Sequence, residues 1–225
     1  MSFYLLNNRI SGTATVSWAV LLQAIGKWIM KGLKMTQNSF IDFLANRRSV
    51  TAKKMARGNI NEDHLKQILS VGIRVPDHGA LKPWRLVVIT GEKRKLIDEE
   101  VIFPEFIQAN PHASAESQSI EKTRLQRADV VIAVISSPVH HKSIPKWEMQ
   151  LSAGAVCTTL LYAAQSLGYA AQWLTEWYSY NPKMLATFGV ELGREQIAGF
   201  IYIGEKVTSP MERTRPNFET VVSYF

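Results

Sequence analysis

Two adjacent arginines and a serine, in the stretch Asn46-Arg47-Arg48-Ser49, form the first group of residues with a clear chemical use. Guanidinium groups match the oxygens of a phosphate in a bidentate manner, and the Ser49 hydroxyl can donate a further hydrogen bond. The group therefore indicates a pocket for a phosphate dianion. The alternative is a helix C-terminus whose arginines interact favourably with the helix dipole, and the stretch taken alone favours this second interpretation.

The stretch RVPDHGALKPWR, residues 74–85, directly precedes an apolar run and forms a second group. Pro76 and Pro83 each fix φ, lack an N–H and restrict the preceding residue, so the stretch is a shaped loop and no helix. Loops of defined shape that lead into a sheet often bind ligands. A proline-rich connection without a binding role is an equally good interpretation.

Several common motifs are absent from the sequence: it contains no GxGxxG, no Walker loop, no HExxH and no GxSxG elbow. This removes the most frequent nucleotide, metal and hydrolase interpretations. His140 and His141 have no cysteine or acidic cluster near them, so they predict a solvated turn and no metal site. The single cysteine, Cys157, lies in an apolar run and predicts a buried, inert thiol. A chain without disulfides is typical of a reducing compartment such as the cytoplasm.

The composition, with 46% apolar and 20% charged residues among 225, predicts a folded chain with a substantial core. Residues 1–34 contain basic residues and no acidic ones, and they carry +4 of the net charge of +7. The remainder is mildly basic and has no Lys/Arg stripe interleaved with aromatics. This favours small anionic ligands over nucleic acid.

Residues 1–34 predict an N-terminal extension in front of a folded domain of residues 35–225. Their apolar stretch, residues 14–30, is interrupted by Gln23 and Lys27 and is too short and too polar for a membrane span. Their basic residues mostly follow the apolar part, unlike those of a secretory signal. A non-essential extension or a mispredicted start is favoured over a membrane-surface helix, which the sequence also allows.

The spacing of apolar residues predicts the elements that must position these groups. The stretch 146–167 has small and apolar residues nearly all round, which indicates a fully buried central helix that ends at Gly168. Residues 103–118 carry two prolines and no strong period, which predicts a lid or a variable insertion. Helical periods and polar caps predict further helices at 38–46, 61–73, 92–101 and 182–188.

Branched and aromatic residues predict the strands. The almost wholly apolar run at 129–136 indicates a central strand that is buried on both faces. The residues at 218–225 predict an extended strand without a partner in the chain. Further strands are predicted at 84–90 and 196–204, and the pattern as a whole indicates an α+β fold whose C-terminal tail reaches across a dimer.

The order of these features resembles that of the nitroreductase family, which comprises flavin-dependent oxidoreductases. The features are NRRS, the P-x(6)-PW loop followed by a strand, the small-residue helix that ends at Gly168, and ERTRP near the C-terminus. The stretches RVPDHGALKPW, IPKWEMQLSAGA and VVSYF are similar to the short, minimal branch of the family, and the resemblance spans about residues 35–225. It implies a mainly antiparallel central sheet flanked by helices, and a homodimer with two FMN sites built from both subunits.

The resemblance also implies roles for individual residues. Arg74 and His78 of one subunit would approach the flavin held by the other. The FMN phosphate and ribityl chain would be held by Arg47, Arg48 and Ser49, and Arg213 or Arg215 would close over the phosphate. The isoalloxazine ring would be lined by Trp173, Leu174 and Thr175. The nicotinamide nucleotide would contact Ala163, Ala164, Gln165, Ser166, Leu167 and Gly168.

The chain departs from many relatives close to the flavin. Where they have Asn and Gln it has Ala80 and Lys82, and where they often have a basic residue after the serine it has Thr51. A cation near flavin N1 and O2 stabilises the anionic reduced flavin and raises its potential. Lys82, Lys53 or His78 would therefore have to supply this charge.

The implied activity is hydride transfer from NADH or NADPH to flavin N5, followed by reduction of a nitroaromatic, quinone-like or related acceptor in a ping-pong cycle. No protein nucleophile is expected, and His78 would hydrogen-bond the flavin or, as the alternative, donate a proton to the acceptor. Glu148 is expected to be buried and to pair with an arginine across the dimer. Two other functions stay open: a flavin enzyme that oxidises a specific metabolite, and a basic protein that binds membranes or nucleic acid.

Overall fold

The computed structural model of the protein describes residues 39–225. The chain divides into two compact units, residues 1–47 and 48–225, and only residues 39–47 of the first are described. Residues 39–46 are helical, and the rings of Phe40 and Phe43 stack with centroids 6.4 Å apart. The described part of the helix predicted at 38–46 is thereby confirmed. The predicted extension of residues 1–34 and its boundary lie outside the described residues.

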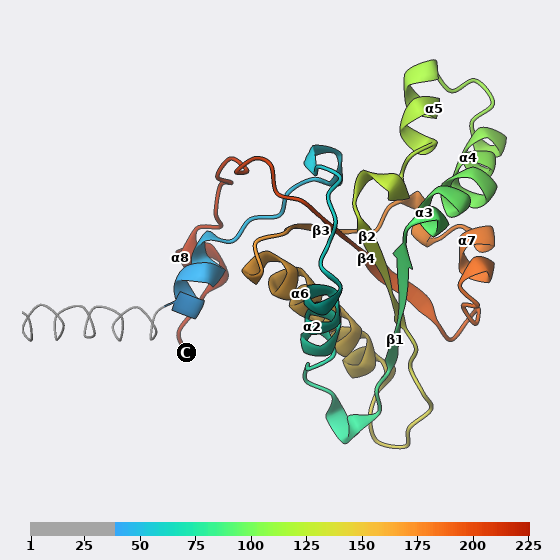
Figure 1. Ribbon diagram of the computed structural model, residues 1–225. Helices are drawn as coiled ribbons and strands as arrows, with labels where there is room; N and C mark the ends of the chain where they lie inside the picture. Colours follow the sequence, from blue (N-terminus) through green and yellow to red (C-terminus); the bar gives the residue numbers. More distant parts are fainter. Residues whose placement is uncertain (1–38) are drawn as a thin grey trace, which may run out of the picture. The chain divides into compact units, whose positions relative to one another are not determined.

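The second unit is built around a four-stranded antiparallel sheet in the order β1-β2-β4-β3 (Figure 1). Strand β2 lies between β1 and β4 and is buried along its whole length, as its apolar sequence predicts. Three strands match the predicted ranges, and the fourth, β3, lies in a segment for which the sequence predicted no element. The strands are β1 (Trp84–Thr90), β2 (Val130–Ser136), β3 (Ala170–Leu174) and β4 (Gln196–Gly204).

Helices and turns cover both faces of the sheet (Figure 1). On one face, α2 (Glu62–Gly72) and α6 (Lys146–Ser166) pack against it, and Ile68 and Leu160 join a buried cluster with the sheet. On the other face, Phe200 and Tyr202 pack with residues of the later helices and turns. The predicted α+β class with a mainly antiparallel sheet flanked by helices is thus confirmed.

The helices on the first face begin and end where the sequence places their signals. The Asn61 side chain accepts hydrogen bonds from the N–H groups of Asp63 and His64, at 2.8 and 3.1 Å, and so caps α2. Gly168, with φ of +87°, follows the end of α6 in the left-handed conformation that glycine favours. The expectation that α6 is fully buried is wrong at its start, because Trp147 is 66% exposed and Leu151 is also exposed.

Residues 92–127 form a series of short helices. The helix predicted at 92–101 is confirmed, and most of the stretch 103–118, where the sequence predicted a lid or a variable insertion, is helical as well. The Ser114 side chain accepts from the Ser117 N–H at 3.2 Å and starts one of them, and Pro104 lies in the first turn of another. The buried Asp98 carboxylate accepts from the Leu125 N–H at 2.9 Å, and burial raises its pKa to about 6. The series is α3 (Glu92–Ile97), the π-helical turn η3 (Asp98–Ile102), α4 (Phe103–Ala109), α5 (Ala115–Glu121) and η4 (Leu125–Arg127).

The C-terminal part contains the turn η5 (Trp177–Ser179), α7 (Pro182–Thr187) and α8 (Phe218–Val221). The strand predicted at 218–225 is wrong over α8, because the Asn217 side chain accepts from the Glu219 N–H at 3.2 Å and starts a helical turn. Across residues 39–225, no helix has both the length and the apolar character that crossing a membrane requires.

Candidate functional site

The segment that begins at Arg48 is attached to the C-terminal end of α6 and to β3. The Gln165 side chain donates to the Arg48 carbonyl at 3.0 Å, and the Ala52 N–H donates to the Gln172 side chain at 2.6 Å. Neither amide has a local signal in the sequence, because each contacts a residue more than a hundred positions away. The two glutamine side chains thus fix the backbone of the segment that contains Arg48 and Ser49.

The tail after β4 returns to the same segment. Oε1 of Glu212 accepts from Nη1 of Arg48 at 2.8 Å and from the Arg213 N–H at 2.8 Å, and it lies 2.9 Å from Nη2 of Arg215. The structure therefore brings Arg48 together with the two tail arginines that the sequence indicated. The Arg213 N–H, together with the Arg215 and Arg48 guanidiniums, holds the pKa of Glu212 below its usual value.

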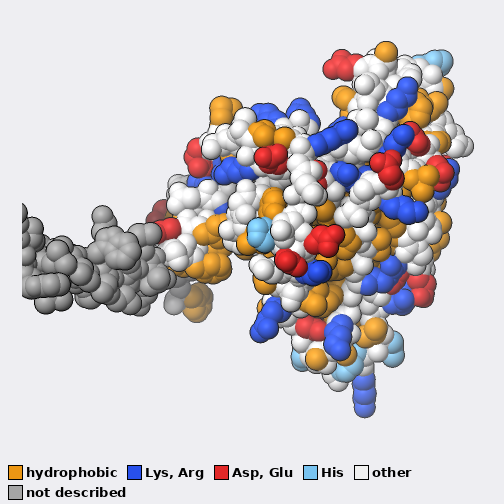
Figure 2. Space-filling model, viewed as in Figure 1, with side chains coloured by type: hydrophobic (Ala, Val, Ile, Leu, Met, Phe, Trp, Pro, Cys, Tyr) orange, Lys and Arg blue, Asp and Glu red, His pale blue; other side chains and the backbone are white. Residues whose placement is uncertain are grey.

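A cavity of about 730 Å³ lies between this segment and the tail. Its charged lining residues are Arg48, Lys54, Arg213 and Glu212, so basic groups outnumber acidic ones. Figure 2 shows several Lys and Arg side chains on this part of the surface. The remaining lining residues are Ser49, Val50, Thr51, Thr208, Ser209, Pro210 and Met211.

Arg47 is the last residue of the first unit. Its N–H donates to the Phe43 carbonyl at 2.7 Å and continues the helix. Its predicted contact with a phosphate stays a prediction.

The residues predicted to line a flavin ring lie at β3, beside the Arg48 segment. The Trp173 indole is 38% exposed, and its N–H donates to the Ala198 carbonyl at 3.1 Å. It fits over Gly199, because a Cβ there would lie only 2.0 Å from the indole nitrogen. Leu174 packs against the core of the opposite face, and Thr175 follows at the end of the strand. A smaller cavity of about 310 Å³ adjoins Leu174, Gln172, Thr51 and Lys53.

The predicted nicotinamide segment, residues 163–168, forms the end of α6 and the turn after it. Ala163 and Ala164 are buried, whereas Ser166 and Gly168 are exposed. Gln165 is the residue that contacts the Arg48 backbone. The segment therefore lies next to the Arg48 segment, and its exposed residues are Ser166 and Gly168.

The other predicted group lies in the loop between α2 and β1, which contains the turn η2 (His78–Ala80). The Asp77 carboxylate accepts from the N–H groups of Leu81 and Lys82, at 3.1 and 2.8 Å. Ala80 and Lys82 have φ of +52° and +50°, a left-handed conformation that Asn and Gly adopt more readily than other residues. Two of the three positions at which the resemblance implies a departure from many relatives are thus the two non-glycine residues with positive φ among the described residues.

The same loop is fixed to the start of α6. Ser152 donates from Oγ to the Pro76 carbonyl at 2.7 Å, and it accepts from the Trp84 indole at 3.1 Å. Nδ1 of His78 lies 2.7 Å from a carboxylate oxygen of Glu148. Glu148 is expected to be buried, but within the chain it is exposed and its partner is His78. Its pairing with an arginine across the dimer stays a prediction. Arg74 is exposed beside this loop.

The predicted site residues therefore form two groups that do not meet within one chain. Gln165 marks the Arg48 group at the C-terminal end of α6, and Glu148 marks the His78 group at its N-terminal end. Glu148 and Gln165 are 17 residues apart in this helix, so the two groups are separated by about 25 Å along its axis. Figure 1 places the turn between α2 and β1 and the turn that follows the Arg48 segment at opposite ends of the sheet.

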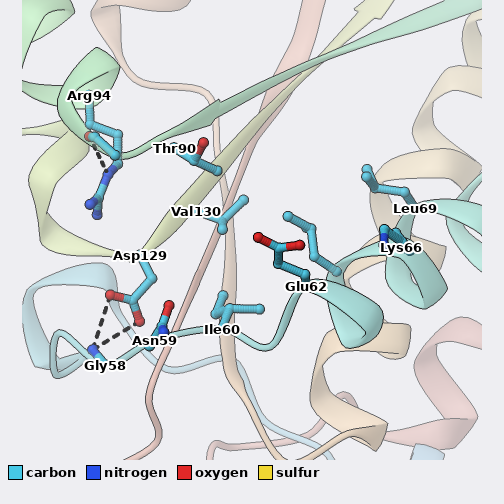
Figure 3. A pocket seen from close by; sticks show the side chains of 12 residues that line it. Gly58, Asn59, Ile60, Glu62, Lys66, Leu69, Thr90, Arg94, Asp129 and Val130 are labelled. Atoms are coloured by element: carbon cyan, nitrogen blue, oxygen red, sulfur yellow. Dashed lines mark hydrogen bonds between the residues drawn. The ribbon is translucent and has the colours of Figure 1, made fainter.

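A further cavity, of about 440 Å³, lies between the start of α2 and the adjoining ends of β1 and β2 (Figure 3). Glu62 and Lys66 border it from α2, and Asp129 and Arg94 border it from the sheet side. The Asp129 carboxylate accepts from the Gly58 N–H at 3.0 Å, and Arg94 donates to the Gly91 and Ala128 carbonyls. Asp129 and Arg94 thus bind the protein's own backbone, and none of the predicted site residues borders this cavity.

Other groups that the sequence singled out lie apart from the Arg48 and His78 groups. Burial raises the pKa of the Cys157 thiol to about 12, which confirms an inert cysteine. His140 and His141 are exposed, and the His141 ring accepts from the N–H groups of Ser143 and Ile144. Residues 39–225 contain no group of three His, Cys, Asp or Glu side chains placed to hold a metal ion.

Comparison with known proteins places these observations in a family. Residues 44–205 match the model of the Nitroreductase family. The chain is 30% identical over 166 residues to the Escherichia coli K12 protein named "Putative NAD(P)H nitroreductase YdjA", an overlap of 73% of this chain and 86% of that protein.

Solved structures share the fold of this chain. A nitroreductase-like family protein from Bacillus cereus superimposes with a TM-score of 0.67 at 20% identity, over 82% of this chain and 95% of the other. A nitroreductase with bound FMN from Bacteroides fragilis superimposes with a TM-score of 0.62 at 18% identity, over 82% and 97%. At these identities the two structures establish the fold.

Proposed function

Because the chain belongs to the nitroreductase family, we propose that it is an FMN-dependent NAD(P)H oxidoreductase that reduces nitroaromatic, quinone-like or related acceptors. The names of its relatives point in this direction, since one is called an NAD(P)H nitroreductase and another was solved with FMN. The geometry at Arg48 carries the proposal for this particular chain.

The fit of the Arg48 pocket to a phosphate is visible in how its donors are used. The Arg48 and Arg215 guanidiniums and the Arg213 N–H all converge on one carboxylate oxygen of Glu212. A phosphate oxygen needs the same arrangement of charge-assisted donors. Arg48 would hold the FMN phosphate with Ser49 beside it, and Arg215 would close over it from the tail.

When bound, FMN would supply the redox chemistry by accepting a hydride at N5 and passing electrons to the acceptor. The side chains of this protein would bind and orient the ring. Gln172 and Gln165 would keep the Arg48 segment against β3 and α6, where Trp173 and Thr175 lie. Lys53 borders the small cavity beside Leu174 and would supply the positive charge that Thr51 lacks.

We propose that a second copy of the chain completes each site. Arg74 and His78 lie at the opposite end of α6 from Arg48, so one chain cannot bring them together. Antiparallel packing of two α6 helices around a two-fold axis would place the start of one helix beside the end of the other. Trp147 and Leu151 are exposed apolar residues on this helix and would be covered by such packing.

The tail supports the same arrangement. Among the described residues, β1 pairs only with β2, so its other edge has no strand beside it. The tail ends in exposed apolar residues that include Val221, Tyr224 and Phe225. If the end of a partner's tail lay along the free edge of β1, it would pair with the backbone of that edge. The exposed apolar residues of the tail would then be buried between the two subunits.

A heterodimer experiment tests both the cofactor and the shared site. Purified protein is titrated with FMN, and bleaching of the bound flavin by NADH or NADPH reports activity. Arg48→Ala should weaken FMN binding by about tenfold to a hundredfold, because a charge-assisted hydrogen bond contributes roughly 1.5–3 kcal/mol. In a doubly tagged heterodimer of an Arg48→Ala chain with an Arg74→Ala chain, one shared site contains both substitutions and the other contains neither. This heterodimer should therefore have one site of native affinity.

The matched control joins the Arg48→Ala/Arg74→Ala double variant to a wild-type chain. This heterodimer should have no site of native affinity if each site takes residues from both subunits. One native site in the control, and none in the first heterodimer, would contradict the shared site. Wild-type protein that takes up no FMN would overturn the proposed function as a whole.

A further inference from the structure

Glu212 uses the donors that a cofactor phosphate would need. Its Oε1 atom receives Nη1 of Arg48 at 2.8 Å, Nη2 of Arg215 at 2.9 Å and the Arg213 N–H at 2.8 Å. A single ion pair would give this oxygen one charged donor, whereas here two guanidiniums and a backbone N–H lie within hydrogen-bonding distance of it. The resemblance to the family implies a role for Arg213 and Arg215 in the stretch ERTRP, but none for Glu212.

The two sides of this contact are bound to the protein to different degrees. The Arg48 side chain is 19% exposed, and its backbone is fixed by Gln165. The Glu212 side chain is 66% exposed and borders the cavity of about 730 Å³. The carboxylate can therefore swing into water at little cost, while Arg48 stays in place.

We propose that Glu212 is a built-in competitor of the FMN phosphate for Arg48 and Arg215. This inference rests on the proposed function, because it concerns the same pocket. A phosphate carries more negative charge than a carboxylate and has three acceptor oxygens, so it wins the competition and repels Glu212. Glu212 would keep the arginines paired until a ligand arrives, and it would select against anions too weak to displace it, such as a single carboxylate.

The charge of Glu212 is what the competition requires, so Glu212→Gln is the informative variant. Glutamine keeps the size of the side chain and can still accept from the Arg213 N–H. The matched control is Glu219→Gln, which makes the same change in net charge at α8 in the same tail, away from the arginines. Because the lost contacts are exposed ion pairs, Glu212→Gln should bind FMN about three- to tenfold more tightly than wild type.

Titration of flavin-free protein, followed by quenching of flavin fluorescence, measures this change. Riboflavin lacks the phosphate, so its affinity should be the same for wild type and Glu212→Gln. Glu219→Gln should match wild type for both ligands. Equal or weaker FMN binding by Glu212→Gln would overturn the proposal, because Glu212 would then only orient the arginines. An equal gain for riboflavin would overturn it as well, since the effect would not pass through the phosphate.

Inorganic phosphate separates this inference from the proposed function. Calorimetric titration with phosphate alone needs no flavin, and Glu212→Gln should bind it several-fold more tightly than wild type or Glu219→Gln. If no variant takes up FMN but this difference is found, the proposed function fails and the competition holds. If phosphate binding is the same in all three proteins, the competition fails whatever the result with FMN.

Discussion

At the N-terminal end of α6 the loop of residues 74–83 is fixed by hydrogen bonds within the chain, whereas at the C-terminal end the tail of residues 208–215 is attached through exposed ion pairs. Asp77 accepts two backbone N–H groups of the loop, and Ser152 joins the loop to the helix. The tail contacts centre on Glu212, whose side chain is mostly exposed. The loop is thus shaped before any ligand binds, and the tail is free to adjust.

This difference suits the roles that we propose for the two ends. A loop that presents Arg74 and His78 to a ring must hold them in one geometry, and preorganisation lowers the cost of binding. A tail that closes over a phosphate must open to admit it, so weak contacts with water-exposed groups are an advantage. The comparison predicts that changes in the loop alter stability and that changes in the tail alter ligand binding.

Within the loop of residues 74–83, the largest effect on stability is expected at Gly79. It has φ of +73°, and a Cβ at this position would lie 2.7 Å from Cδ1 of Ile144. Gly79→Ala should therefore lower the free energy of unfolding by about 2–3 kcal/mol, from the left-handed conformation together with the steric contact. Urea unfolding followed by tryptophan fluorescence measures this change.

Gly91→Ala is the control for Gly79→Ala. Gly91 also has a positive φ, of +55°, but no atom lies within 4 Å of the position of its Cβ. It should show the backbone cost alone, about 1–2 kcal/mol. If Gly79→Ala costs no more than Gly91→Ala, the loop is not held tightly against Ile144 and the contrast between the two ends of α6 is weaker than we describe.

Much of the fold could be predicted because its main elements carry strong local signals. The apolar run of β2 and the cap at Asn61 each specify an element without reference to the rest of the chain. The helices at 103–121 were missed because they are short and show no clear period. The tail was predicted as a strand from Phe218 onward because its branched residues outweighed the capping side chain of Asn217.

The sequence singles out the candidate residues but not the side chains that they contact, and the roles of these residues stay predictions. Arg48, His78 and Arg215 could be singled out from the sequence, and the resemblance to a family supplied their roles. The partners Glu148 and Gln165 could not be identified, because each meets its partner only after the sheet and α6 have packed. Asp77 did have a local signal, since an aspartate in front of a glycine-containing turn often accepts from the backbone N–H groups that follow.

The smallest effect on stability is expected in the tail, at Arg215. Its ion pair with Glu212 joins two exposed side chains, at 52% and 66% exposure. Arg215→Gln should change the free energy of unfolding by less than about 0.5 kcal/mol, because exposed pairs contribute little. The same variant should weaken FMN binding several-fold, since a closing contact to the phosphate is lost. Urea unfolding and FMN titration on one preparation measure both quantities.

Arg85→Gln provides the contrast for Arg215→Gln, because Arg85 lies in β1 just after the fixed loop. Its guanidinium donates to the almost fully buried Glu195 at 2.9 and 3.1 Å, and these hydrogen bonds lower the pKa of Glu195 to about 2. Arg85→Gln should cost roughly 1.5–3 kcal/mol, since the buried carboxylate loses the closer of its two arginine partners and keeps only Arg194, at 3.5 Å. The Glu195 contribution should be constant above about pH 4.3, the usual pKa of glutamate, and should be lost as the pH falls toward 2. An Arg215→Gln variant as unstable as Arg85→Gln would show that the tail is part of the folded frame, and the distinction between a fixed and an adjustable end of α6 would then fail.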